Sequence, residues 1–139
     1  VFLKKKNVTF INDSKATTLQ AAKFALTSCK NIYWIVGGMP KYKDKINLKH
    51  VKKNIIRSYI IGKNTIFFKR IFNNKIKFSV SKNLNRAIIK IQKDIQSSKK
   101  INKTILLSPG AASFDQYKNF EARGDKFKKL CKEYVKKFI

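Results

Sequence analysis

Three short polar segments carry most of the side chains in this chain that could bind a ligand. They read INDSKATT, IVGGMPK and LLSPGAASFDQYKNFEARG. Each contains the end of an apolar run of strand length and leads away from it into polar sequence. Together they offer hydroxyls, carboxylates, lysines and paired glycines, groups that hold an anionic ligand through charge and hydrogen bonds. The segments therefore predict an anion-binding site.

The first segment leads from an expected strand into an expected helix. Thr17 or Thr18 can serve as the N-cap, and the helix start offers free N–H groups and the positive end of the helix dipole. Lys15 adds a full positive charge, and Asp13 can accept hydrogen bonds from sugar hydroxyls. A capped turn without a ligand is the alternative interpretation of these residues.

The second segment closes a strand with two glycines. Gly37 and Gly38 would let the backbone approach a ligand closely, and Lys41 follows in the loop. Because Gly-Gly-x-Pro is also ordinary turn chemistry, the segment is weak evidence by itself.

The third segment turns the chain at Ser108-Pro109-Gly110 and is expected to begin a short helical segment at Ser113. Successive N–H groups around Ser113 and Phe114 would form a nest for a carboxylate, with the Ser113 hydroxyl as a further donor. A simple strand-to-helix turn would not require so many functional side chains.

The elements that position these segments alternate between strands and helices. This alternation predicts a Rossmann-like, three-layer α/β domain whose mostly parallel sheet has about six strands, one antiparallel edge strand and helices on both faces. The expected strands are Val8–Asn12, Ile32–Gly37, Ser58–Ile61, Ile76–Val80 and Thr104–Leu107, with VFLKKKNVTFIN forming the antiparallel edge. The expected helices are Leu19–Cys29, Leu48–Ile55, Thr65–Ile71, Leu84–Ile95 and Phe127–Phe138.

Charge dominates the composition, with 33 Lys and Arg against 7 Asp and Glu and a formal net charge of +26. A stand-alone basic module that binds nucleic acid is therefore an alternative, although the lysines are dispersed and no nucleic-acid motif is present. Cys29 and Cys131 are expected to be reduced core residues of two helices, and no metal site is expected. No apolar run reaches the roughly 18 to 20 residues of a membrane span, so a cytoplasmic protein without a membrane partner is expected.

The three segments, in this order and at this spacing, resemble the C-terminal domain of the Mur ligases, and among them the branch that adds D-glutamate. The resemblance covers essentially the whole chain, and related branches carry a Tyr-Ala-His-type sequence where this chain has NDSKAT. The family usually reads Ser-Pro-Ala-Cys-Ala-Ser in the third segment, whereas this chain has Gly110 and Ala111 in the middle pair. Both are small, so the turn is expected to survive.

The resemblance implies a ligase of three domains, of which residues 1–139 would be the third, the amino-acid-binding domain. An N-terminal UDP-binding domain and a central ATPase domain would lie outside this chain, in agreement with the absence of a GxxxxGK[ST] loop and of an initiator Met. ATP and Mg²⁺ would be held mainly by the central domain. The isolated chain is then expected to be inactive, and the parent is expected to be a monomer.

Residue by residue, the resemblance implies two groups of contacts. Asp13 and Lys15 would face the nucleotide. The positions that would hold the two carboxylates of D-glutamate are Thr17, Lys41, Ser113, Phe114 and Phe120. The motifs are completed by Asn12, Ser14, Gly37, Gly38 and Asp115.

The implied reaction is the ATP-dependent, ADP-forming joining of D-glutamate to UDP-N-acetylmuramoyl-L-alanine in peptidoglycan synthesis. The parent enzyme would convert the alanyl carboxylate into an acyl phosphate, which the amine of D-glutamate attacks. A degenerate domain of the same family that has only an interaction role is a further alternative, against which the retained motif residues argue.

Overall fold

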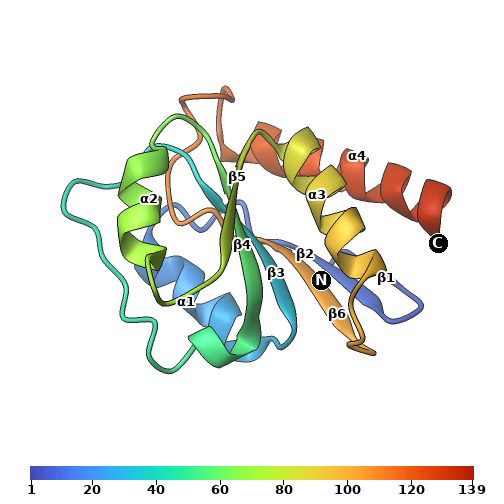
Figure 1. Cartoon of the computed structure of the whole chain (residues 1–139). Coiled ribbons are helices and arrows are strands. Elements are labelled where there is room, and N and C mark those ends of the chain that lie inside the picture. The colour runs from blue at the N-terminus through green and yellow to red at the C-terminus, as the bar shows by residue number, and fades with distance from the viewer.

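The computed structural model describes residues 1–139, in which a six-stranded sheet lies between two pairs of helices (Figure 1). The strand order is β1-β2-β6-β3-β4-β5. The strands are β1 (Leu3–Lys5), β2 (Val8–Asn12), β3 (Ile32–Gly37), β4 (Ile55–Ile61), β5 (Phe78–Lys82) and β6 (Lys103–Leu107). The helices are α1 (Leu19–Ser28), α2 (Thr65–Phe72), α3 (Leu84–Gln96) and α4 (Phe120–Phe138), with one 3-10 turn, η1, at Lys52–Asn54.

All neighbouring strands are parallel except β1, which pairs antiparallel with β2. The Lys-rich turn between these two strands places Lys6 at φ 51°. Strand β6, the last along the chain, lies between β2 and β3 and pairs with both. The predicted α/β class, the mostly parallel sheet and the antiparallel edge are thereby confirmed.

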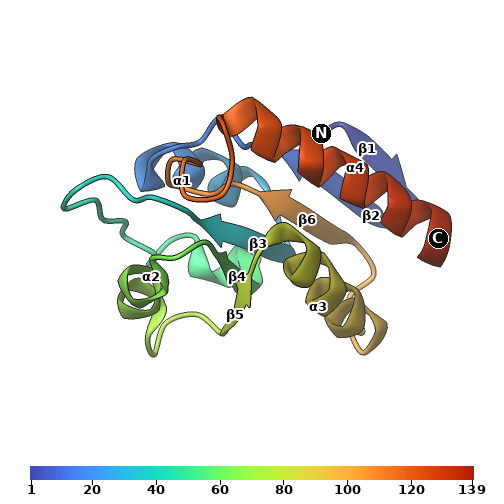
Figure 2. The same ribbon diagram turned by 90° about the horizontal axis from the view of Figure 1, so that it is seen from above.

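The sheet separates two apolar layers, which Figure 2 shows from above. Alternate residues of a strand point to opposite faces. In β3, Tyr33 and Ile35 pack with residues of α3 and α4, while Trp34 and Val36 pack with residues of α1 and α2. Every residue of β3 is buried, as expected for a central parallel strand covered on both faces.

Side-chain caps define the starts of three helices. Thr18 accepts a hydrogen bond from the Ala21 N–H and begins α1. Of the two expected N-caps, Thr17 and Thr18, the chain therefore uses Thr18. Asn83 and Asn119 accept from the Arg86 and Ala122 N–H groups and begin α3 and α4. Each cap satisfies one N–H group that has no partner inside its helix.

Several expected boundaries differ from the structure. The prediction of a helix at Leu48–Ile55 is wrong, because this segment contains only η1 and the first residue of β4. Strand β5 lies two residues later than expected, and α4 begins at Phe120, seven residues before the expected Phe127. The short helical segment expected at Ser113 is a single turn closed by Tyr117 N–H to Ser113 O at 2.8 Å.

The two cysteines have different environments. Cys131 is buried in α4, as expected, and burial raises the pKa of its thiol. Cys29 packs partly buried against the apolar layer of α1 and α2, but it is the C-cap of α1, so the expectation that it lies inside the helix is wrong. Both are free.

Candidate functional site

The three polar segments follow three neighbouring strands. The first follows β2, the third follows β6 and the second follows β3, which is the order of these strands in the sheet. Because the strands are parallel, their carboxyl ends meet at one edge, the position where open α/β sheets bind ligands. The topology therefore brings together segments that lie about 100 residues apart in sequence.

Backbone hydrogen bonds join the segments directly. Asp13 N–H donates to Leu107 O at 2.7 Å, and Gly37 N–H donates to Pro109 O at 2.9 Å. Met39 and Ala112 exchange both of their backbone hydrogen bonds, at 2.8 and 2.9 Å. The third segment thus lies between the other two and is bonded to each.

Arg123 is the centre of this edge and is 1% exposed. Its Nε donates to Ser14 Oγ at 2.9 Å, its Nη2 to Ser14 O at 2.7 Å and its Nη1 to Ala111 O at 2.9 Å. Ser14 Oγ in turn donates to Phe120 O at 2.7 Å. Burial lowers the pKa of Arg123 to about 10, which leaves it charged at neutral pH. One side chain therefore fixes the first segment, the third segment and the start of α4.

Gly37 and Gly38 allow backbone to approach backbone within the chain. Their φ angles are 130° and 136°, in a region that side chains rarely adopt. A Cβ on Gly37 would clash with Ile61 O, and one on Gly38 would clash with Ala112 O. The close approach expected at these glycines therefore exists, but its partners here are β4 and the third segment.

Asp13 is held in place by Ser108. The Ser108 hydroxyl donates to Asp13 Oδ2 at 2.7 Å, and Ser108 O accepts from the buried Trp34 Nε1 at 2.7 Å. Burial raises the pKa of the Asp13 carboxyl, and the hydrogen bond from Ser108 opposes this shift. The Asp13 carboxylate thus has a defined position at the end of β2 and is still partly exposed.

Lys15, Thr17 and Lys41 have no side-chain partner in the chain. Lys15 and Lys41 are exposed and form no ion pair, and the partly exposed Thr17 forms no side-chain hydrogen bond. Thr17 and Lys15 belong to the first segment, and Lys41 is the last residue of the second. Two cations and a hydroxyl are therefore free for a ligand beside the ordered backbone of this edge.

The N-terminus of α1 is occupied from within the chain. Leu19 N–H donates to Asp44 Oδ2 at 2.9 Å, in addition to the Thr18 cap. The sequence predicts that the start of this helix accepts a ligand anion, whereas here an internal carboxylate takes one of its N–H groups. Thr17, one residue before the cap, remains free.

The third segment supplies N–H groups without acceptors. The backbone N–H groups of Phe114 and Phe120 donate no hydrogen bond within the chain. Phe114 is 68% exposed, and Phe120 is partly buried. Ser113 is 2% exposed, and its hydroxyl has no partner in the chain. Asp115 accepts from Lys63 N–H at 3.1 Å and thereby anchors the segment to the loop after β4.

Gly110 explains the departure from the usual family pattern. It has φ 65°, in the left-handed region, and a Cβ there would lie 2.8 Å from Leu19 Cδ2. Glycine adopts this conformation without steric cost. The turn expected from two small residues is present, and glycine suits its geometry.

The functional residues that the sequence did not indicate are Arg123, Asp44 and Ser108. Arg123 carries a weak signal, since it is one of only four arginines among 33 basic residues and stands inside the third segment. Asp44 carries another, because it is the only acidic residue between Asp13 and Asp94. Ser108 shows no such signal, since its partners become evident only from the sheet order.

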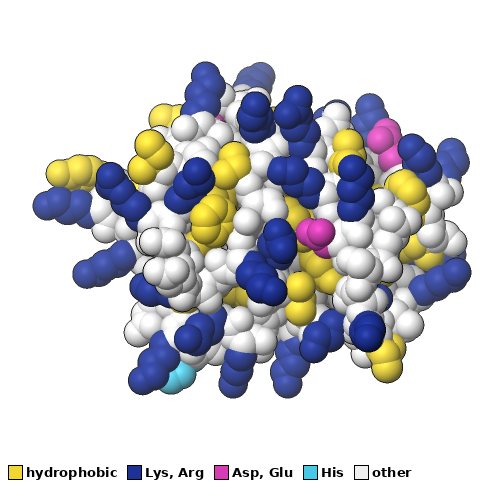
Figure 3. Space-filling view, viewed as in Figure 1, with side chains coloured by type: hydrophobic (Ala, Val, Ile, Leu, Met, Phe, Trp, Pro, Cys, Tyr) yellow, Lys and Arg dark blue, Asp and Glu magenta, His cyan; other side chains and the backbone are white.

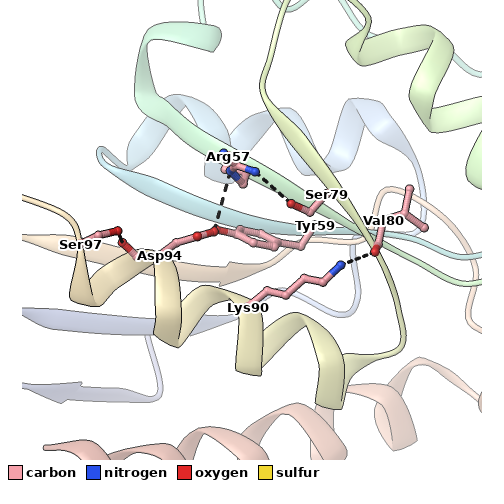
Figure 4. Close-up of polar contacts among 7 residues, drawn as sticks. All are labelled: Arg57, Tyr59, Ser79, Val80, Lys90, Asp94 and Ser97. Atoms are coloured by element: carbon pink, nitrogen blue, oxygen red, sulfur yellow. Dashed lines mark hydrogen bonds and ion pairs between the residues drawn. The ribbon is translucent and has the colours of Figure 1, made fainter.

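A second polar cluster joins α3 to the sheet away from these segments (Figure 4). Tyr59 OH donates to Asp94 Oδ2 at 2.6 Å, and Arg57 lies between Asp94, at 3.8 Å, and Ser79 Oγ, at 3.1 Å. Lys90 of α3 donates to Val80 O of β5. Burial, and then the bond to Asp94, raise the pKa of Tyr59. We call Arg57, Tyr59, Ser79 and Asp94 the helix cluster, and Ser14 and Arg123 with the carbonyls of Ala111 and Phe120 the loop cluster.

Basic side chains form no single patch on the face of the molecule that Figure 3 shows. On the face shown in Figure 3, Lys and Arg are spread over the whole surface, with few acidic groups among them. No three His, Cys, Asp or Glu side chains are grouped so that they could hold a metal ion. None of the helices combines the length and apolar character of a membrane span.

The fold and the edge that the three segments form define a Rossmann-like α/β domain with a polar edge at the carboxyl ends of its parallel strands. Comparison with known proteins identifies it further. The chain is 41% identical over 121 residues to the UDP-N-acetylmuramoylalanine–D-glutamate ligase of Agrobacterium fabrum, a match that covers 87% of this chain and 26% of the relative. It is 42% identical over 132 residues to the ligase of the same name from a Wolbachia of Brugia malayi, covering 94% of this chain and 26% of the relative.

A third relative with this name, from Rhizobium meliloti, is 40% identical over 124 residues, or 89% of this chain and 27% of the relative. The chain therefore belongs to the family of these ligases and corresponds to their C-terminal part. It spans about a quarter of the length of the relatives it matches. No protein-family model matches the chain.

Proposed function

We propose that this chain is the C-terminal, amino-acid-binding domain of an ATP-dependent ligase that adds D-glutamate to UDP-N-acetylmuramoyl-L-alanine. The relatives it matches bear the name of that activity. The observation that carries the proposal is the meeting of the three segments on adjacent strands, with two unpaired lysines, a free hydroxyl and free N–H groups around one edge. A dianionic amino acid needs donors and cations at two points, and this edge offers both.

The residues of the edge would divide the two ligands between them. Asp13 would contact the ribose of ATP, and Lys15 its phosphates. Thr17 and Lys41 would hold one end of D-glutamate. The Ser113 hydroxyl and the N–H groups of Phe114 and Phe120 would hold its other carboxylate. Asn12, Ser14, Gly37, Gly38 and Asp115 would shape the edge without touching a ligand, as the internal bonds of Ser14 and Asp115 suggest.

This domain would contribute binding and orientation to the reaction. ATP, with Mg²⁺, supplies the phosphoryl group that turns the alanyl carboxylate into a reactive acyl phosphate, and both would be held mainly by other parts of the ligase. A carboxylate in a fixed position orients the amine of D-glutamate toward that carbonyl, which raises the effective concentration of the nucleophile. Closure of the domain would also exclude water that hydrolyses the acyl phosphate.

The test uses the full-length ligase that contains this chain. Lys41→Ala removes a full charge from the amino-acid end, so we expect the KM for D-glutamate to rise at least tenfold while the KM for ATP changes less than twofold. Lys15→Ala should have the opposite pattern and impair the ATP-dependent half-reaction. An unchanged KM for D-glutamate in Lys41→Ala would refute the assignment.

A second measurement concerns the isolated chain. Because the proposal has ATP and Mg²⁺ held mainly by other parts of the ligase, the purified 139-residue protein should show no turnover with D-glutamate, ATP and the UDP-linked substrate. Full-length ligase assayed in parallel provides the positive control. Turnover by the isolated chain would contradict the proposed division of labour.

A further inference from the structure

Asp44 makes a contact that the proposed function does not use. Its Oδ2 accepts the Leu19 N–H, the first backbone donor of α1, at 2.9 Å. Its Oδ1 accepts the Lys45 N–H at 3.0 Å. The side chain is partly buried against the start of the helix. A carboxylate in this position is stabilised by the free N–H group and by the positive end of the helix dipole.

The same residue closes the turn that carries Lys41. Asp44 N–H donates to Lys41 O at 2.9 Å, so that Lys41 and Asp44 are the first and last residues of a hydrogen-bonded turn. Within the turn Lys43 has φ 59°, a conformation that costs a non-glycine residue free energy. The turn is therefore not held by local preference alone, and the contact of Asp44 with α1 is an independent restraint on it.

The segment of residues 43 to 47 has few polar contacts besides those of Asp44. It contains no helix or strand, and apart from Asp44 its side chains form one hydrogen bond, in which the Lys49 N–H donates to Asn47 Oδ1 at 3.0 Å. Lys41 itself is exposed and unpaired. The Asp44–Leu19 contact thus joins the turn that begins at Lys41 to the first residue of α1, two positions after Thr17.

We infer that Asp44 is a positioning residue: by tethering the Lys41–Asp44 turn to the N-terminus of α1, it holds Lys41 beside Thr17 for the carboxylate of the amino acid. This inference rests on the proposed function, which places that carboxylate at Thr17 and Lys41. The tether also removes one N–H group of α1 from ligand binding, so the amino acid depends on Lys41 and hydroxyl groups there. Asp44 touches no ligand and takes no part in bond formation.

The sequence context agrees with a specific task for this carboxylate. Asp44 is the only acidic residue among the 80 positions between Asp13 and Asp94. Its two direct neighbours in sequence, Lys43 and Lys45, are basic. An acid that served only to balance charge would be equally useful at many positions of this basic chain. At position 44 the side chain reaches the Leu19 N–H, while the backbone of the same residue closes the turn that begins at Lys41.

The experiment compares Asp44→Ala with Thr18→Ala in the full-length ligase. Thr18→Ala is the matched control, because it removes the other cap of α1 without touching the turn. We expect Asp44→Ala to raise the KM for D-glutamate by about five- to tenfold, with less than a twofold change in the KM for ATP. Thr18→Ala should lower the melting temperature to a similar extent and leave both KM values within twofold. Asp44→Asn keeps an acceptor oxygen and should fall between Asp44→Ala and the unaltered enzyme.

Hydrogen exchange gives a reading that does not depend on activity. Peptides that cover Lys41–Lys45 should exchange at least tenfold faster in Asp44→Ala than in the unaltered ligase, and at an unchanged rate in Thr18→Ala. Equal KM increases in both variants, or unchanged exchange in Asp44→Ala, would overturn the inference. Lys41→Ala is assayed alongside. If it leaves the KM for D-glutamate unchanged, the proposed function is refuted. If Lys41→Ala has a large effect on this KM and Asp44→Ala has none, only the positioning role of Asp44 is refuted.

Discussion

The loop cluster and the helix cluster are both organised by an arginine, but the two arginines differ in what surrounds them. Arg123 is 1% exposed and donates three hydrogen bonds of 2.7 to 2.9 Å to a hydroxyl and two carbonyls. Arg57 has a side chain that is 35% exposed, and its ion pair with Asp94 has a distance of 3.8 Å. The first arginine joins two loops to the start of α4, while the second lies beside contacts between one helix and the sheet.

The difference shows how this chain uses polar groups of the same kind for different purposes. A buried guanidinium must have its donors satisfied, so its partners are fixed in space and the loops that carry them are fixed too. A surface ion pair competes with water and fixes little. The candidate site is therefore held by the loop cluster, and the helix cluster stabilises the docking of α3.

The largest effect is expected from Arg123→Ala. It leaves Ser14 O and Ala111 O without their buried partners, so we expect a loss of about 3–5 kcal/mol of unfolding free energy. Urea unfolding of the 139-residue chain measures this. Arg86→Ala, an exposed arginine on α3, is the control and should cost less than about 0.5 kcal/mol. Similar losses in the two variants would show that Arg123 is no more important than a surface residue.

A smaller effect is expected from Ser108→Ala, at the side of the loop cluster. Removal of the hydroxyl takes away the hydrogen bond that favours the charged form of Asp13, so the pKa of Asp13 should rise further. We expect a loss of about 1–2 kcal/mol at neutral pH, since hydrogen bonds to charged groups contribute about this much.

The pH dependence of this variant has a definite sign. The Asp13 pKa in the folded state is higher in the variant than in the unaltered chain, so the difference in stability is fully present above both values. It shrinks as the pH falls through them, because a protonated carboxyl no longer needs the donor. NMR titration of the Asp13 carboxyl carbon, with urea unfolding at several pH values, tests both parts. An unchanged Asp13 pKa would contradict the prediction.

Tyr59→Phe tests the strongest contact of the helix cluster. The hydroxyl donates to Asp94 at 2.6 Å, and its loss should cost about 1 kcal/mol because Asp94 is partly exposed and can bind water instead. Tyr42→Phe, at a tyrosine that is 86% exposed, serves as the control and should change nothing measurable. A loss of 3 kcal/mol or more would place the helix cluster on a level with the loop cluster.

The smallest effect is expected from Arg57→Gln. An exposed ion pair contributes about 0–1 kcal/mol and is weakened by salt, so the loss should lie in that range and shrink in 1 M NaCl. Thermal unfolding at low and high salt measures it. A loss that persists at high salt would show that Arg57 acts through its bond to Ser79 rather than through Asp94.

The fold could be predicted from the sequence because its central strands are continuous apolar runs. Ile32–Gly37 is buried throughout and was predicted with both boundaries. The false helix at Leu48–Ile55 has a physical cause: Leu48, Val51 and Ile55 are all buried and spaced by three and four residues, as on a helix face. The same spacing arises here from a turn, a 3-10 turn and the first residue of a strand.

The late expected start of α4 has a different cause. Gly124 lies within its first turns, and glycine usually weakens a helix. The structure shows why it is tolerated, since a Cβ there would lie 2.8 Å from Asn12 Nδ2. The candidate ligand-binding residues were proposed from residue type, spacing and the family resemblance. Arg123 and Asp44 could not be proposed in this way, because their hydrogen-bond partners are distant in sequence. The partners of Arg123 lie 12 and 109 positions away, and the partner of Asp44 lies 25 positions away.

The position of β6 has a consequence for the order in which the molecule can be made. Strands β2 and β3 do not pair with each other, because β6 lies between them and pairs with both. During synthesis, the N-terminal hairpin and the β3–β5 unit thus remain two unconnected pieces until residues 103–107 leave the ribosome. The edge that holds Asp13, Lys41 and Ser113 also needs Arg123, so we expect it to be assembled only after both β6 and the start of α4 have been made.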